Sequence, residues 1–299
     1  MRTKRVLRLG CVLSITVLAA PLAQSANGKR TFRSDHLEAD VVVLPTVFFP
    51  NEAEVAVLPF MKENAARFEG KTVLEIGTGS GIISLYAARL GARKVVATDI
   101  NEQAVMNATL NARRLDLGDI IEARRVPASD ITAFSVIRPD ERFDVLISNP
   151  PYALDLDAKQ NTPLTDRGDL GLSIVRGLDA HLNPGGVAIL LYNSLFYHYV
   201  MVKFAKYEGF EVRNHGPAFF APWEAETLFN DYLGHLLASE KMDPDAFRFD
   251  RHENEALDRI RVSSPHAPLF PGNSKKRYPG IIVIERSADA AARGTAGAP

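Results

Sequence analysis

Cysteine and tryptophan are almost absent from this sequence, which has one of each in 299 residues. The single cysteine, Cys11, lies in the N-terminal leader described below, so the rest of the chain can form neither a disulfide nor a thiolate metal site. The seven histidines are scattered without the spacing of metal ligands, and no metal is expected. The apolar part of the leader is shorter than the about 20 residues that a membrane-spanning helix needs. These absences exclude disulfide-rich scaffolds, thiolate metal centres and a membrane span in the mature chain.

The first 26 residues follow the order of a secretory signal peptide. Four basic residues precede an apolar stretch, and Ala23 and Ser25 satisfy the small-x-small rule for cleavage after Ser25. The sequence therefore predicts an exported protein, periplasmic or secreted. A cytoplasmic protein with a start codon assigned too far upstream is the alternative. Without the leader the chain has 31 basic against 36 acidic residues, a net charge near −5, which disfavours a large non-specific nucleic-acid surface.

Beyond residue 41, short β-branched runs alternate with helical stretches, a pattern that favours a parallel sheet with crossover helices. An apolar run at 41–44 has no assigned role, and 183–186 carries a turn signal. Helices are expected over 50–64, 81–90, 104–115, 169–182 and 196–208. Strands are expected over 71–77, 94–100, 121–126, 143–148, 187–193, 210–212 and 280–285.

Glu75–Gly81 is a glycine-rich segment directly after the first of these strands and before a helix. Gly77, Gly79 and Gly81 allow a tight turn and a close approach of the backbone to a ligand. Asp99 ends the next strand, 22 residues beyond Gly77, where its carboxylate can accept hydrogen bonds from both hydroxyls of a ribose. This combination predicts an adenosine-containing cofactor at a topological switch point, and a tight turn without a ligand is the alternative.

The spacing in this glycine loop distinguishes between cofactors. A dinucleotide-binding loop has the pattern G-x-G-x-x-G and holds a pyrophosphate, whereas this loop has the pattern E-x-G-x-G-x-G. The carboxylate of Glu75 would repel a pyrophosphate, but it suits the positively charged methionine moiety of S-adenosylmethionine. The sequence therefore predicts S-adenosylmethionine as the cofactor, bound by Glu75, Thr78 and the glycines of the loop.

The tetrapeptide Asn149–Tyr152 (NPPY) follows the fourth strand, which in an open α/β sheet places it beside the cofactor. Pro150 and Pro151 fix the backbone and leave carbonyl groups free to face a ligand. The side-chain oxygen of Asn149 and the carbonyl of Pro150 can accept both hydrogens of an NH₂ group, and Tyr152 offers a flat face to a planar substrate. This grip would orient the nitrogen lone pair toward a methyl donor; a rigid turn is the alternative.

Residues 72–193 resemble the Rossmann-like S-adenosylmethionine-dependent methyltransferases. The tetrapeptide resembles the motif of their amino-methyltransferase branch, which includes HemK-type enzymes that methylate a glutamine side-chain amide and relatives that act on exocyclic amines of adenine or guanine. The resemblance implies a doubly wound α/β fold with a seven-stranded, mostly parallel sheet and an antiparallel last strand. It assigns the cofactor loop to Glu75, Gly77, Gly79 and Gly81, the ribose to Asp99, the adenine amino group to Asp130, and catalysis to Asn149, Pro150 and Tyr152.

The predicted domain organisation is a signal peptide (1–26), a methyltransferase domain (27–287) and a flexible tail (288–299). The core of the domain, 45–220 and 278–287, is interrupted by a helical insertion at 221–277. The expected function is methyl transfer to a planar amino or amide nitrogen, on a protein in preference to a nucleic acid. A nucleic-acid amino-methyltransferase and an exported, non-catalytic binding protein on the same fold are the alternatives.

Overall fold

The structure is a computed structural model that describes residues 28–50, 53–130, 132–150, 153–154, 165–166, 169–192, 201–202, 204–215 and 280–286. The predicted signal peptide, the insertion, the tail, and Pro151 and Tyr152 of the tetrapeptide lie outside the described residues. Among the described helices, none combines the length and the apolar character that a membrane span requires.

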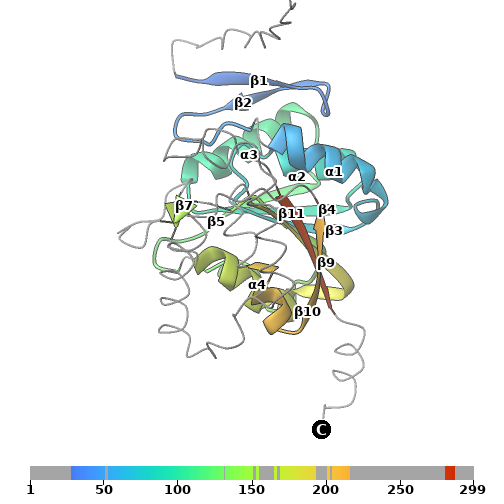
Figure 1. The fold of residues 1–299 in the computed structure, drawn as a ribbon. Coiled ribbons are helices and arrows are strands. Elements are labelled where there is room, and N and C mark those ends of the chain that lie inside the picture. Colours follow the sequence, from blue (N-terminus) through green and yellow to red (C-terminus); the bar gives the residue numbers. More distant parts are fainter. Residues whose placement is uncertain are drawn as a thin grey trace, which may run out of the picture.

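A seven-stranded sheet forms the centre of the molecule, in the order β10-β11-β9-β6-β3-β4-β5 (Figure 1). Strands β9, β6, β3, β4 and β5 are parallel, whereas β11 is antiparallel to both of its neighbours. The predicted doubly wound fold with an antiparallel last strand is thereby confirmed. The bounds are β3 Thr72–Ile76, β4 Lys94–Asp99, β5 Ile121–Arg125, β6 Phe143–Ser148, β9 Leu182–Tyr192, β10 Phe210–His215 and β11 Gly280–Arg286.

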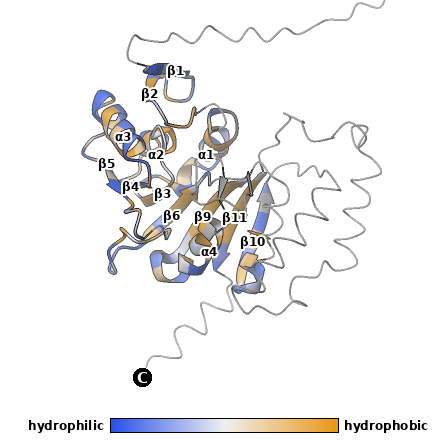
Figure 2. Ribbon diagram, turned by 90° about the vertical axis from the view of Figure 1, so that its left-hand side faces the viewer, coloured by the Kyte–Doolittle hydropathy of each residue, from blue (hydrophilic) through white to orange (hydrophobic). Residues whose placement is uncertain are grey.

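Helices cover both faces of this sheet, with α1, α2 and α3 on one face and α4 on the other (Figures 1 and 2). Each face therefore has its own cluster of buried apolar side chains. A strand covered on both sides is apolar on both sides, and all five residues of β3 are buried. The bounds are α1 Leu58–Glu63, α2 Ile82–Arg89, α3 Glu102–Arg114 and α4 Asp169–His181.

Two predicted boundaries differ from the structure. The helix expected over 50–64 consists of a π-helical turn, η1 (Ala53–Val57), followed by α1, and a short 3₁₀ helix, η2 (Ala65–Arg67), comes after it. The turn predicted at 183–186 is a bulge within β9, because Phe143 of β6 faces Leu182 while Val145 faces Val187. The side-chain amide of Asn183 donates to Asp144 (2.9 Å) and ties this bulge to β6.

Two small strand pairs were not predicted. The first is an N-terminal hairpin of β1 (Arg30–Ser34) and β2 (Ala39–Val43), which packs against α3 (Figure 1). The apolar run at 41–44 belongs to β2, where Val41 and Val43 are fully buried. The second is the parallel pair of β7 (Ala153–Leu154) and β8 (Thr165–Asp166).

A single carboxylate, that of Glu54 in η1, holds the tip of the N-terminal hairpin. Its Oε1 accepts from the backbone N–H of Asp35 (2.8 Å), the backbone N–H of His36 (3.1 Å) and the ring Nδ1 of His36 (2.9 Å). Its Oε2 accepts from the hydroxyl of Ser34 (2.7 Å). Burial raises the pKa of Glu54, but the hydrogen bonds from His36 and Ser34 outweigh burial and hold that pKa below its ordinary value.

We expect Glu54→Ala to lower the free energy of unfolding at pH 7 by about 3 kcal/mol, because hydrogen bonds to a partly buried charge are lost together. The stabilisation by a carboxylate of lowered pKa is present above its ordinary pKa and disappears as the pH falls through its folded value. Denaturant unfolding at pH 7 is the measurement, with the exposed Glu63→Ala as the matched control. A loss no larger than that of the control would contradict the assignment.

Candidate active site

A cavity of about 430 Å³ opens at the carboxyl ends of β3, β4 and β6. It lies at the position where the strand order reverses. From β3 the chain continues to β4 and β5 on one side, and then returns to β6 and β9 on the other side. Ligands of open α/β sheets bind at this position. The cavity is lined by residues 46–48 of the N-terminal segment, the glycine loop 75–80, residues 98–101, and Asn149 and Pro150.

The glycines of the loop have the conformations that the sequence predicts. Gly77, Gly79 and Gly81 all have positive φ, at 79°, 52° and 85°. A Cβ on Gly77 or Gly79 would meet nothing within 4 Å, so these residues border open space. A Cβ on Gly81 would lie 2.9 Å from the Cα of Ala108. Gly81 therefore allows α2 to approach α3, while the other two glycines leave the backbone open to a ligand.

Glu75 is the buried acid of this site, with 1% of its surface exposed. Its Oε2 accepts from the hydroxyl of Thr78 (2.8 Å), the backbone N–H of Ser84 (3.1 Å) and the Ser84 hydroxyl. Burial raises the pKa of Glu75 to about 8, although these hydrogen bonds oppose the shift. A buried carboxyl group of this kind favours a cationic ligand, because a nearby positive charge stabilises its ionised form.

Asp99 joins the end of β4 to the glycine loop. One carboxylate oxygen accepts from the backbone N–H of Gly79 (2.9 Å) and the other from that of Asn101 (2.8 Å). Burial raises the pKa of Asp99 above its ordinary value. Because an ionised carboxylate can accept about four hydrogen bonds, Asp99 keeps capacity to accept from a ligand hydroxyl. This arrangement fits the predicted ribose contact, which stays a prediction.

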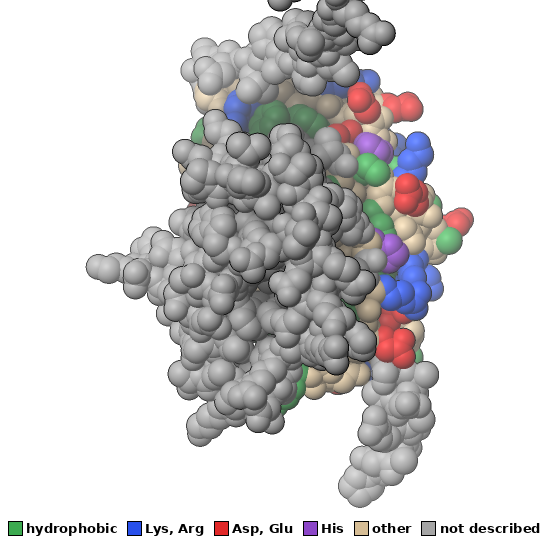
Figure 3. Space-filling model, in the orientation of Figure 1, with side chains coloured by type: hydrophobic (Ala, Val, Ile, Leu, Met, Phe, Trp, Pro, Cys, Tyr) green, Lys and Arg blue, Asp and Glu red, His purple; other side chains and the backbone are tan. Residues whose placement is uncertain are grey.

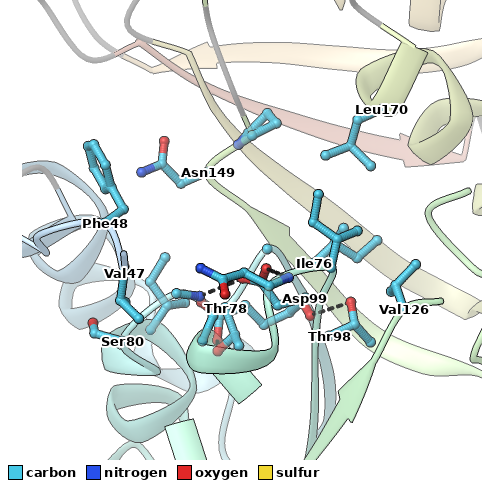
Figure 4. Close-up of a pocket in the computed structure, with 18 of the residues that line it drawn as sticks. Val47, Phe48, Ile76, Thr78, Ser80, Thr98, Asp99, Val126, Asn149 and Leu170 are labelled. Carbon is cyan, nitrogen blue, oxygen red and sulfur yellow. Dashed lines mark hydrogen bonds between the residues drawn. The ribbon is translucent and has the colours of Figure 1, made fainter. Parts of the chain in front are cut away.

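Asn149 and Pro150 lie at the end of β6 and line the same cavity. Figure 4 shows Asn149 and Phe48 across the cavity from Thr78 and Asp99. The side-chain oxygen of Asn149 is buried and accepts no hydrogen bond within the described part of the chain. A buried acceptor without a donor costs about 1–3 kcal/mol. Such an oxygen at a cavity wall indicates a position for a ligand N–H.

Two predicted site residues in the described part of the chain, Gly81 and Asp130, are not among the residues that line the cavity. Asp130 lies beyond β5. The side chain of Asp130 is exposed, and its carboxylate accepts from the hydroxyl of Thr132 (3.1 Å). Val126 and Thr132 line the cavity from this part of the chain. The proposed contact of Asp130 with the adenine amino group stays a prediction.

Several lining residues were not predicted. Thr46, Val47 and Phe48 come from the segment after the N-terminal hairpin, far from the glycine loop in sequence. Asn101 lines the cavity and caps α3, accepting from the backbone N–H of Gln103 (3.0 Å). Its position two residues after Asp99 is a local signal that could have identified it. The sequence carries no comparable signal for residues 46–48.

The charged side chains among the described lining residues of the cavity are all acidic. Glu75 and Asp99 both line it, whereas no lysine, arginine or histidine occurs among its described lining residues. The described residues also contain no group of three side chains that could hold a metal ion. Methyl transfer from a sulfonium needs no metal. The buried acids and the open glycine backbone therefore fit S-adenosylmethionine, with Glu75 toward its positive charge and Asp99 toward its ribose.

We expect Glu75→Gln to stabilise the protein relative to wild type as the pH rises. The pKa of the Glu75 carboxyl group rises from 4.5 to about 8 on folding. Its contribution to stability is therefore complete below pH 4.5 and is lost as the pH rises toward 8. Glutamine does not titrate. In denaturant unfolding of the cofactor-free proteins, the advantage of the variant should grow by at least about 1 kcal/mol between pH 5 and pH 8. An advantage that is constant over this range would show that Glu75 is ionised throughout.

Two comparisons with known sequences support this reading of the site. A family profile for ribosomal protein L11 methyltransferase (PrmA) matches residues 60–150. A release factor glutamine methyltransferase of Koribacter versatilis is 34% identical over 161 residues, which are 49% of this chain and 55% of the relative. The chain thus spans about half the length of that relative.

A solved structure, a ribosomal protein L11 methylase from Lactobacillus delbrueckii subsp. bulgaricus, overlaps 82% of this chain and 84% of its own, with 18% identity and a TM-score of 0.48.

This chain covers most of the length of a further relative. That relative is a putative protein N5-glutamine methyltransferase of Methanocaldococcus jannaschii, 32% identical over 176 residues, which are 56% of this chain and 83% of the relative. With this coverage, the glycine loop after β3 and the sheet order, the chain belongs to the HemK-like family of class I S-adenosylmethionine-dependent methyltransferases.

Proposed function

We propose that this protein transfers a methyl group from S-adenosylmethionine to the side-chain amide nitrogen of a glutamine in a protein. The observation that carries the proposal is the buried, unpaired oxygen of Asn149 at the wall of the cofactor cavity. Two relatives of the chain, the release factor glutamine methyltransferase and the putative protein N5-glutamine methyltransferase described above, support the same substrate class.

Different residues of the chain bind the cofactor and the substrate amide. Bound S-adenosylmethionine supplies an electrophilic methyl group on its sulfonium. Glu75 and Asp99 hold the cofactor from the ends of β3 and β4, whereas Asn149 lies at the end of β6, the neighbour of β3 on the other side. Three adjacent parallel strands thus bring the two halves of the site together.

Asn149 would orient the amide by accepting one of its N–H groups, and the Pro150 carbonyl would accept the other. The amide nitrogen then has its out-of-plane electrons free to attack, and orientation of this kind lowers the barrier substantially. As the carbon–nitrogen bond forms and the carbon–sulfur bond breaks, one N–H proton leaves to solvent. Tyr152 stays a sequence-based candidate for stacking on the amide, outside the described residues.

Charge favours a protein over a nucleic acid as substrate. Acidic and basic side chains are mixed on the described surface visible in Figure 3. Without the leader, the chain has a net charge near −5. A polyanionic substrate generally needs a basic surface, so we propose a protein partner.

We expect Asn149→Ala to lower the rate of methyl transfer by about 100-fold or more, on the order of 3 kcal/mol. The affinity for S-adenosylmethionine should change little, because Asn149 orients the amide. Transfer of radiolabelled methyl groups to glutamine-containing peptides measures the rate, with leucine-substituted peptides and a DNA oligonucleotide as controls. Tyr152→Phe should cost much less than Tyr152→Ala, because stacking needs only the ring.

The outcomes of this assay separate the alternatives. Asn149→Ala that labels peptides as well as wild type does would refute the role of Asn149. Labelling of the oligonucleotide alone would favour a nucleic-acid methyltransferase. Cofactor binding without labelling of any acceptor would favour a non-catalytic binding protein.

We also propose, from the leader alone, that the protein is exported and that its mature chain begins near Ala26. N-terminal sequencing of the protein from its native host is the measurement. A native protein that retains Met1 would contradict export by a cleaved signal peptide.

A further inference from the structure

Two buried asparagines of α3, Asn107 and Asn111, bind the strand β2 of the N-terminal hairpin. The carbonyl of Val42 accepts from both side-chain amides, at 2.7 Å from Asn107 and 2.8 Å from Asn111. The N–H of Val42 donates to Asn111 (3.0 Å), and the N–H of Leu44 donates to Asn107 (2.7 Å). Each asparagine therefore makes two hydrogen bonds to the hairpin, and together they satisfy its buried backbone groups.

Only Asn111 also reaches the glycine loop. Its side-chain amide donates a further hydrogen bond to the backbone carbonyl of Ser80 (2.9 Å), between Gly79 and Gly81. Asn111 and Ser80 are both buried, with 1% and 3% of their surface exposed. The hydrogen bond is thus shielded from water, and a substitution would leave the Ser80 carbonyl without this donor.

The hairpin continues directly into one wall of the cofactor cavity. Thr46, Val47 and Phe48 line this wall, and Thr46 has a left-handed φ of 63° that is uncommon for a residue with a Cβ. The carbonyl of Thr46 accepts from the side chain of Asn101 (3.1 Å), which fixes the wall at the end nearer the hairpin. We call residues 46–48 the N-terminal wall. A continuous path of hydrogen bonds and chain thus runs from the glycine loop through Asn111 and β2 to this wall.

We propose that Asn111 is a positioning residue that couples the N-terminal wall to the glycine loop, so that hairpin docking and S-adenosylmethionine binding stabilise each other. The proposal rests on the cofactor assigned above and deepens it. Two parts of the cavity that are distant in sequence share one buried side chain. A ligand that orders one part lowers the free-energy cost of ordering the other, and this coupling is reciprocal.

Asn107 provides a matched control, because it has the same number of hydrogen bonds to the hairpin and none to the glycine loop. We expect both Asn107→Leu and Asn111→Leu to lower the melting temperature of the cofactor-free protein. In calorimetric titration, Asn111→Leu should bind S-adenosylmethionine about tenfold more weakly than Asn107→Leu does. Equal affinities would overturn the coupling through Ser80. Absence of binding by wild type would instead overturn the cofactor assignment.

Hydrogen exchange of wild type tests the proposal without any variant. The amides of Val42 and Leu44 belong to residues that are not among those lining the cavity, so the cofactor does not protect them by direct contact, and the coupling requires that it slow their exchange. We expect saturating S-adenosylmethionine to slow their exchange about fivefold or more. Unchanged exchange at both amides, with protection at Gly79 confirming that the cofactor is bound, would overturn the proposal.

Discussion

The hydrogen bond from the Gly79 N–H to the carboxylate of Asp99 connects the loop after β3 to the end of β4. Two further bonds act beside it, since the N–H groups of Gly77 and Thr78 both donate to the carbonyl of Thr98. The loop thus depends on parallel pairing of the two strands in this register. Glycine supplies the left-handed backbone that the turn requires. The cavity, the entry of α2 and the burial of Glu75 all follow from this attachment.

The central sheet was largely predictable because its inner strands are covered on both faces and are therefore rich in apolar residues. The boundaries of β3, β4, β5 and β6 lie within a residue of those expected from the sequence. The glycine loop and Asp99 were found for a second reason, since the turn chemistry and the strand end are local in sequence. These features need no knowledge of which distant segments meet.

Features built from distant segments were not predictable in the same way. The strand β1 (RTFRS) has too few apolar residues to be recognised alone, and its partner β2 is a short run of valines. The role of Glu54 depends on a turn 18–20 residues earlier in the chain. The N-terminal wall could not be inferred either, because only the docking of the hairpin on α3 brings residues 46–48 to the cavity. Asp130 was assigned through resemblance alone, and its side chain is exposed.

The antiparallel strand β11 has a consequence for the order in which the chain is assembled. It lies between β9 and β10 in the sheet, yet it is the last of the described strands to be synthesised. The five parallel strands that carry the cofactor cavity can pair as soon as residue 192 has left the ribosome. In contrast, β10 can pair with β11, its neighbour in the described sheet, only after residue 286 has been synthesised. Until then, no other strand in the described part of the chain occupies the edge of β9 that β11 covers. An unpaired edge of this kind can pair with other chains, so truncation before β11 would favour aggregation.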